Sequence, residues 1–237
     1  MCAVIGYYSE EPCEKDKKML EELLYQSKIR GLHSFGLTFE NNFILSTIKE
    51  FEVGSINIPK TTMLMAHTRY STSGDWKSKE NNQPLKLDDS HLVFNGVIDM
   101  ATKKEMEKKY NIKMKSNNDG EIFLHYLNQG VEPVKIIKDL KSSFSGIFIK
   151  DNEIYCLRNE NRPLWRVVIG KSVFVASTKD IFLRSQKKLK PKPVIQNKTI
   201  KLKELLEPNR GIQELSYPDD ENWGYRPSLL MPTLSGK

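Results

Sequence analysis

The chain has 237 residues, enough for one large domain with its own core, and 38% of them are hydrophobic while 28% are charged. This composition is typical of a globular protein, and it excludes a disordered chain or a membrane bundle, since no run approaches the roughly 18 apolar residues that cross a bilayer. The apolar start at residues 2–5 has no basic region before it. We therefore expect no secretory signal and a cytoplasmic protein.

Basic residues outnumber acidic ones by 37 to 30, which gives a net charge of +7. Much of the excess lies between residues 187 and 203, where the sequence has seven lysines and no acidic residue. A solvated connector is the simplest interpretation. Binding of a nucleic acid is the weaker alternative, because no aromatic side chains stand among the lysines to stack on bases. The three cysteines form no C-x-x-C pair, which argues against a disulfide framework or a zinc ribbon.

The first half of the chain predicts strands around one long helix. A buried strand is expected over residues 2–8, and an amphipathic helix over about 15–29, closing at Gly31. Two apolar runs at 35–39 and 43–48, joined by residues 40–42, predict a hairpin. Short strands at 63–67 and 91–94 each end in a polar cluster, which is where sites are usually built.

The second half predicts helices and then strands. Helices are expected around 101–109, 119–128 and 134–140, followed by a meander of hairpins with strands at 144–149, 154–157, 164–169 and 173–176, and a short helix at 178–184 capped by Thr178. This order indicates an α+β protein with antiparallel sheets. We expect a core domain over residues 1–186 and a lysine- and proline-rich connector and tail over 187–237 that is a candidate partner-docking element.

Cys2 is the first candidate for chemistry. Initiator methionine is normally removed before a small residue, and removal would leave Cys2 with a free α-amine. That amine has a pKa of about 7.7 to 8.0, so it can accept the thiol proton near neutral pH and act as general base. One residue would then supply both nucleophile and base, whereas Cys13 and Cys156 have no such partner.

Six further segments, together with residues 1–6, carry motifs that point in the same direction as Cys2. The six are Arg30-Gly31-Leu32-His33-Ser34-Phe35-Gly36, residues 66–74 (Ala-His-Thr-Arg-Tyr-Ser-Thr-Ser-Gly), Asn82-Gln83-Pro84-Leu85, residues 94–98 (Phe-Asn-Gly-Val-Ile), Asn118-Asp119-Gly120-Glu121 and Arg162-Pro163-Leu164. In type and order they resemble the class II glutamine amidotransferases, the glutaminase domains of the N-terminal-nucleophile hydrolase superfamily. The resemblance implies a four-layer αββα sandwich, L-glutamine as substrate, and no metal or organic cofactor.

The resemblance also implies roles for particular residues. Cys2 would be the nucleophile, and the Asn95 side chain and Gly96 N–H would form the oxyanion hole. Arg69 would clamp the α-carboxylate of glutamine and Asp119 would receive its α-ammonium. Thr72 and Ser73 would line the substrate site.

Each of these residues also has an ordinary structural interpretation. Arg69 alone is typical of a surface salt bridge, Asn95-Gly96 of a hairpin turn, and Asp119 of a helix cap. His67, just before the arginine, is best interpreted as a core histidine with its hydrogen bonds satisfied. The sequence departs from the family pattern at His33, where an acidic residue is usual, and at Gly120, where the family has threonine.

The motifs look closest to two branches of the family, phosphoribosyl pyrophosphate amidotransferase and glucosamine-6-phosphate synthase. Both enzymes join the glutaminase to a second domain that consumes the ammonia. Here only 51 residues follow residue 186. Either a separate ammonia-accepting synthase polypeptide is the partner, or the protein acts as a stand-alone amidohydrolase. We expect the separate synthase, because ammonia lost to solvent would waste the reaction. Two alternatives stay open: an N-terminal-nucleophile cysteine hydrolase of another amide, and a non-catalytic regulator that binds glutamine.

Overall fold

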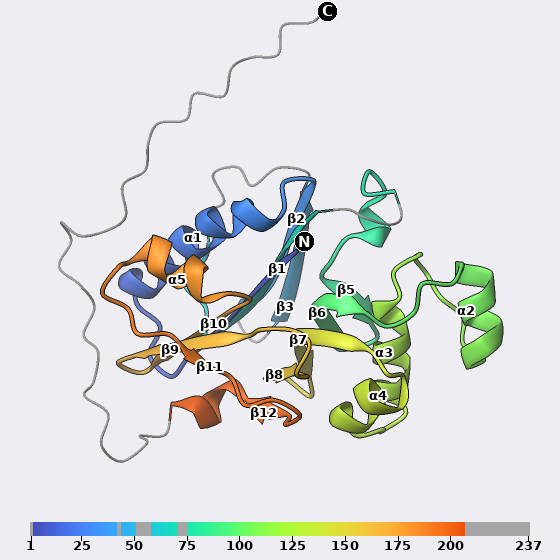
Figure 1. Cartoon of the computed structure of the whole chain (residues 1–237). Coiled ribbons are helices and arrows are strands. Elements are labelled where there is room, and N and C mark those ends of the chain that lie inside the picture. The colour runs from blue at the N-terminus through green and yellow to red at the C-terminus, as the bar shows by residue number, and fades with distance from the viewer. Residues whose placement is uncertain (1, 42–43, 51–57, 71–74, 207–237) are drawn as a thin grey trace, which may run out of the picture.

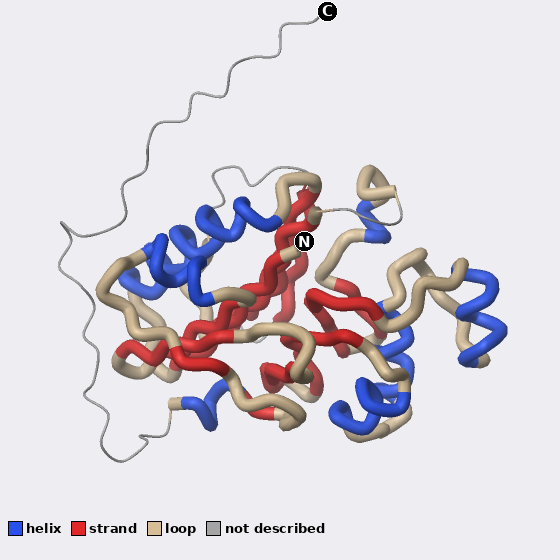
Figure 2. Tube along the Cα trace, viewed as in Figure 1, coloured by secondary structure: helices blue, strands red, loops and turns tan. Residues whose placement is uncertain are grey.

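The computed structural model describes residues 2–41, 44–50, 58–70 and 75–206. It has four layers, seen edge-on in Figures 1 and 2, with two antiparallel sheets packed face to face between helices. Helices α1 (Glu14–Ser27) and α5 (Lys179–Ser185) cover one sheet, and α3 (Gly120–Asn128) and α4 (Pro133–Asp139) cover the other. The predicted αββα sandwich is confirmed.

The first sheet has seven strands with β1 (Ala3–Ser9) at its centre, between β10 and β4. Both neighbours are distant in sequence and pair antiparallel to β1. The strands, in spatial order, are β11 (Lys192–Pro193), β9 (Trp165–Ile169), β10 (Ser172–Ala176), β1, β4 (Met63–Arg69), β2 (Ser34–Asn41) and β3 (Ile44–Glu50).

The second sheet has five strands and carries the outer helices on its far face. In spatial order they are β12 (Ile200–Lys201), β8 (Glu153–Arg158), β7 (Ser143–Lys150), β6 (Ser90–Val97) and β5 (Leu85–Leu87). The remaining helix, α2 (Lys103–Tyr110), contributes Met106 to the core on this side. Short 3₁₀ turns complete the described fold: η1 (Lys28–Arg30), η2 (Lys79–Asn81) and η3 (Leu202–Leu205).

Side-chain alternation along β1 divides the interior. Ile5 and Tyr7 point to α1 and α5, whereas Val4 points into the layer between the two sheets, where it packs with Val93 of β6 and Ile147 of β7. We call this the inter-sheet layer. Side chains on a strand alternate between its two faces, so Cys2, two residues before Val4 and just before β1, faces the same layer.

Two predictions about the second half of the fold were wrong. The strands after residue 144 do not form one meander: β7 and β8 pair in the five-stranded sheet, whereas β9 and β10 pair in the seven-stranded sheet. A local hairpin signal fixes the pairing within each hairpin but not the sheet that it joins. Thr178 occupies the N-cap of α5, yet its side chain makes no capping hydrogen bond.

The lysine-rich segment adds a short strand to each of the two sheets. Within it, β11 pairs with β9 and β12 pairs with β8. Leu202 and Leu205 of η3 pack into the inter-sheet core, while Lys201 and Lys203 form ion pairs with Glu153. The division at residue 186 stays a prediction, as does a docking role beyond it. Within the described residues, no helix has the length and apolar character needed to span a membrane.

Candidate functional site

Cys2 lies at the edge of the inter-sheet layer, at the end of the central strand. Its thiol is half-buried, with Sγ 3.8 Å from the carbonyl oxygen of Tyr70. Its own carbonyl accepts a 2.8 Å hydrogen bond from Nε of Arg30. The backbone of Cys2 is thus fixed from both sides, by the sheet and by the segment after α1.

Arg69 is the last residue of β4, beside Cys2. Its side chain is buried, and Nη1 donates to the carbonyl oxygen of Asn81 at 3.0 Å and to Oδ1 of Asn82 at 2.6 Å. Burial lowers the pKa of the guanidinium, while the negative charges of a Cys2 thiolate and of Asp75 oppose that shift. The structure therefore brings the candidate nucleophile and a fixed cation into electrostatic contact. Arg69 is not the exposed surface residue of the ordinary interpretation.

Asn95 lies on β6, which faces β1 and β4 across the inter-sheet layer. It shares a face with Val93, so its side chain points into that layer. Only 6% of the residue is exposed, and among the described residues nothing accepts a hydrogen bond from its Nδ2. A buried donor without an acceptor is rare in proteins, so the Asn95 amide has an N–H available for a bound molecule or an ordered water.

Gly96 follows Asn95 within the same strand, so the two residues form no hairpin turn. A Cβ at this position would lie 1.9 Å from the carbonyl oxygen of Ser143, which explains the glycine. Phe144, the residue opposite, bonds through both its N–H and its carbonyl to Asn159 on the other side of β7. Gly96 is therefore a non-hydrogen-bonded position of the β6–β7 ladder, and its N–H points away from β7.

Asp119 immediately precedes α3, but its carboxylate does not cap that helix. Instead Oδ2 accepts from the backbone N–H groups of Ile98 at 2.6 Å and Asp99 at 3.0 Å. Burial is the main influence on this group and raises its pKa, while the two backbone hydrogen bonds act in the opposite direction. Asp119 thereby ties the segment after Gly96 to the start of α3.

A network of asparagines, which the sequence analysis did not predict, joins Arg69 to this second region. The carbonyl oxygen of Asn81 accepts from both Arg69 and Nδ2 of Asn118, and its Oδ1 accepts from the backbone of Asn117. The sequence analysis names Asn82 only within a motif and predicts no contact for it. In the structure its Nδ2 donates to the carbonyl oxygen of Trp76. The two contacts from Asn117 and Asn118 to Asn81 span 36 and 37 residues of sequence, so local patterns carry no signal for them.

The segment that departs from the family pattern packs against the same end of β4. A Cβ on Gly31 would lie 2.4 Å from the carbonyl carbon of Arg69, so only glycine fits there. The His33 ring stacks on Tyr70 at 4.8 Å and on Trp76 at 5.3 Å between ring centroids. An aromatic stack thus occupies the place where the family pattern has an acid.

The remaining predicted site residues, Thr72 and Ser73, lie outside the described residues. His67 is buried as expected. Neither ring nitrogen has a partner in the part of the chain that the structure describes, so the expectation that its hydrogen bonds are satisfied stays a prediction.

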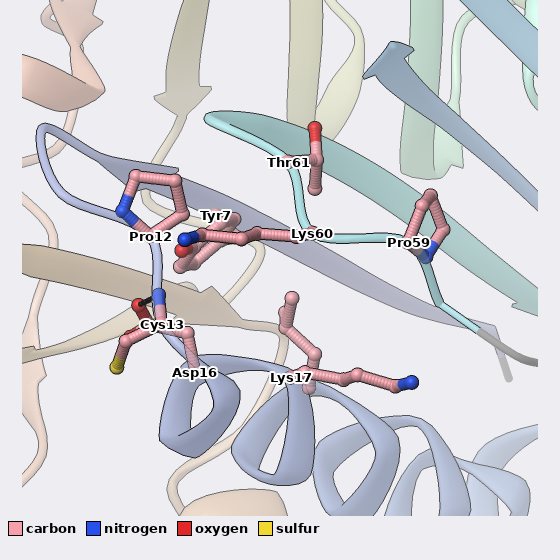
Figure 3. Close-up of a pocket in the computed structure, with 9 residues that line it drawn as sticks. Tyr7, Pro12, Cys13, Asp16, Lys17, Pro59, Lys60 and Thr61 are labelled. Carbon is pink, nitrogen blue, oxygen red and sulfur yellow. Dashed lines mark hydrogen bonds between the residues drawn. The ribbon is translucent and has the colours of Figure 1, made fainter.

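A separate small hollow lies at the other end of β1, at the start of α1 (Figure 3). The backbone N–H of Cys13 is bonded there to Oδ2 of Asp16 at 2.8 Å, so the carboxylate already occupies the start of the helix. None of the predicted site residues lines this hollow. Its lining residues are Tyr7, Pro12, Cys13, Asp16, Lys17, Leu20, Pro59, Lys60 and Thr61.

Comparison with known sequences finds relatives, although no protein-family model matches the chain. It is 26% identical over 195 residues to enzymes of Bacillus spizizenii and Bacillus subtilis named glutamine–fructose-6-phosphate aminotransferase (isomerizing). The match covers 77% of this chain and 31% of each relative. The chain therefore spans about a third of the length of these curated relatives.

Comparison with solved structures points to the same fold. The glutamine phosphoribosylpyrophosphate amidotransferase of Bacillus subtilis, complexed with ADP and GMP, superposes with a TM-score of 0.62 at 20% identity, covering 76% of this chain and 43% of that one. A structure described as the allosteric regulatory enzyme of purine biosynthesis gives a TM-score of 0.59. The resemblance drawn from the motifs is thus confirmed: the chain resembles glutamine-dependent amidotransferases in sequence and has the fold of these amidotransferase structures.

Proposed function

We propose that the chain is the glutaminase component of a glutamine amidotransferase. The Cys2 thiolate attacks the side-chain amide carbon of L-glutamine, and the tetrahedral intermediate collapses with loss of ammonia. Water then cleaves the γ-glutamyl thioester, which yields glutamate and regenerates the thiol. The unpartnered, buried Nδ2 of Asn95, facing the layer that Cys2 borders, is the single observation that carries this proposal.

The first step needs a base, and Cys2 supplies it after removal of Met1. Its free α-amine would take the thiol proton and return it to the departing nitrogen. The hydrogen bond from Arg30 to the Cys2 carbonyl restricts the backbone and so fixes where the thiol and amine point. The nucleophile would be held in place before substrate arrives.

The negative charge that develops on the amide oxygen needs donors already in position. Asn95 Nδ2 and the Gly96 N–H are suited to this role, because neither is used in the β6–β7 ladder. Both are held on a strand inside the sheet, so donating to the oxyanion requires no rearrangement. Two fixed donors in a buried site would stabilise the oxyanion more than water does.

The α-carboxylate and α-ammonium of glutamine would lie between the end of β4 in one sheet and the start of α3 on the other. Arg69 would pair with the α-carboxylate and Asp119 with the α-ammonium, with Thr72 and Ser73 lining the site. The Asn81–Asn118 network supports this assignment, because it fixes the two oppositely charged groups relative to each other. A free amino acid would satisfy both groups at once, which favours glutamine over an N-acyl amide.

The test begins with the intact mass of the purified chain, followed on the same sample by glutamate release from L-glutamine. A chain without Met1 should release glutamate, and Cys2→Ser should abolish release while Cys13→Ser, the matched control, leaves it unchanged. A processed chain that releases ammonia from another amide but not from glutamine would favour the alternative hydrolase. Glutamine binding without turnover in the processed chain would favour the regulator.

Ammonia released into water is protonated and lost to the synthetic reaction, so we propose a separate synthase polypeptide as its acceptor. The names of the curated relatives support transfer to an acceptor. Adding the correct synthase and its acceptor should incorporate amide nitrogen from ¹⁵N-glutamine in the presence of excess unlabelled ammonium. Full dilution of the label by that ammonium would contradict direct transfer.

A further inference from the structure

A second set of buried polar groups lies one step deeper in the inter-sheet layer than Cys2 and Arg69. His67 precedes Arg69 by two residues on β4 and pairs with Val4, two residues after Cys2. Two strand residues advance roughly 7 Å and keep the same face, so His67 lies behind the candidate site. Only 1% of it is exposed.

The facing sheet supplies the other members of the set. Ser145 of β7 is fully buried and lies opposite Asn95 of β6. Both alternate with Ile147 and Val93 of the inter-sheet core, so both point into the layer. Within the described chain, Ser145 Oγ has no hydrogen-bond partner, as for Asn95 Nδ2 and both nitrogens of His67.

Contacts between the sheets place these groups at one level. Gly36 pairs with His67, and a Cβ on Gly36 would lie 2.2 Å from the carbonyl oxygen of Gln83. The Oε1 of Gln83 in turn accepts a 2.6 Å hydrogen bond from the N–H of Phe94, the neighbour of Asn95. His67 and Asn95 therefore lie on opposite walls of the layer beside the same segment.

The chemistry of these groups limits what fits between them. Burial, reinforced by the charge of Arg69, lowers the pKa of His67 to about 3, so its ring is neutral and offers one donor and one acceptor. Ser145 offers a donor and two acceptors, and the Asn95 amide has two N–H donors. An apolar molecule would leave all of them unpaired, and an ion would find no opposite charge among them. A small neutral molecule that both donates and accepts, such as water, meets the requirements.

We propose that His67, Ser145 and Asn95 hold an internal water site behind Cys2, and that through this water His67 is a positioning residue for the Asn95 amide. The water accepts one N–H of Asn95 and donates to His67. The second N–H is then directed at the substrate oxygen, and the reversed amide, which would present oxygen to an oxyanion, is disfavoured. This inference rests on the proposed glutaminase function.

Kinetics of the full, processed chain test the positioning role. In His67→Leu the kcat for glutamine should fall about tenfold or more, short of the 10²–10³ expected when an oxyanion donor is itself removed. The KM should stay within about twofold, and His67→Gln, which keeps a donor and an acceptor, should recover part of the loss. His91→Leu is the matched control, since His91 is a buried β6 histidine with both nitrogens also unpartnered in the described chain, four residues from Asn95.

A double-mutant cycle separates positioning from structure. In an Asn95→Ala background, His67→Leu should cause no further fall in kcat, because the amide that it positions is gone. An additive loss, or an equal loss in His91→Leu, would mean that His67 acts only through packing and would overturn the positioning role.

Crystallography tests the water site without relying on activity, so its result is distinct from failure of the glutaminase proposal. A high-resolution structure should show density within hydrogen-bond distance of a His67 nitrogen, Ser145 Oγ and Asn95 Nδ2. Collapse of the layer onto His67, with only carbon atoms around its nitrogens, would contradict the proposal. If His67→Leu does not fold, His67→Gln and this structure still decide the question.

Discussion

Arg69 and Asn118 donate to the same acceptor, the carbonyl oxygen of Asn81. Arg69 ends a strand of one sheet, and Asn118 lies at the start of the helix that covers the other. The shared acceptor therefore sets the distance between Arg69 and Asp119, the two groups that we assign to the charged end of glutamine. Substrate selection would depend on a residue that contacts no substrate.

Asn118→Ala tests this coupling. Loss of the Asn118 side chain removes its bond to Asn81 and its acceptance of the Gly120 N–H, so the KM for glutamine should rise about 3- to 30-fold with a smaller change in kcat, as expected for one or two hydrogen bonds. Initial rates against glutamine concentration measure it. Asn117→Ala is the matched control, because Asn117 contributes only its backbone N–H to the network. Equal effects of the two variants would count against the coupling.

Arg69→Ala should weaken glutamine binding more severely. A paired carboxylate would lose charge-assisted hydrogen bonds, so we expect the KM to rise at least about 100-fold. Arg69→Lys should recover only part of the loss, because an ammonium lacks the planar fork of the guanidinium. A KM within twofold of wild type in a folded Arg69→Ala protein would refute the clamp. Thermal melting checks folding, since Arg69 also binds Asn81 and Asn82.

Asn95→Ala should act on turnover instead of binding. Removing one oxyanion donor costs about 10²- to 10³-fold in kcat, and the ground-state amide has little need of it, so the KM should change little. The amide bonds to no described residue through Nδ2, so the melting temperature should stay within about 4 °C of wild type. A large fall in melting temperature with normal kcat would identify Asn95 as structural.

The raised pKa of Asp119 predicts a pH dependence of binding. As pH falls through this pKa, which lies above the ordinary value of 3.8, Asp119 becomes neutral and the KM for glutamine should rise. The same group favours the folded protein at low pH, because the folded state holds this proton more tightly than the unfolded state does. That stabilisation is lost as pH rises through the folded pKa, so stability and glutamine binding change in opposite directions with pH. Asp119→Asn, which keeps an acceptor for Ile98 and Asp99, should have a high KM at all pH values. A KM for wild type that does not rise as the pH is lowered from 7 to 3.8 would contradict the assignment.

The sequence predicted the elements better than their assembly. The hairpin at residues 35–48 and the helix after Pro133 follow from local alternation, turn and capping signals, and both are present. The split of β7–β8 and β9–β10 between sheets was missed, because strand pairing over a hundred or more residues leaves no local pattern.

The same limit applies to the site. Motif order identified Cys2, Arg69, Asn95 and Asp119, and the roles of these residues stay predictions. The Asn81 acceptor, the aromatic stack on His33 and the unpartnered nitrogens of His67 were not predicted. Each depends on which side chains meet across the two sheets, and that is decided by packing instead of by neighbours in sequence.

The position of β1 has a consequence for how the protein is made. The strand that leads from Cys2 is translated more than 160 residues before its second neighbour, β10, which spans residues 172–176. A fragment ending at Lys150 would contain every described residue to which we assign a role, but β1 would keep an open, apolar edge. Such edges recruit other strands, so the fragment should aggregate before it hydrolyses anything. β1 is therefore left with one unpaired edge until β10 has been made.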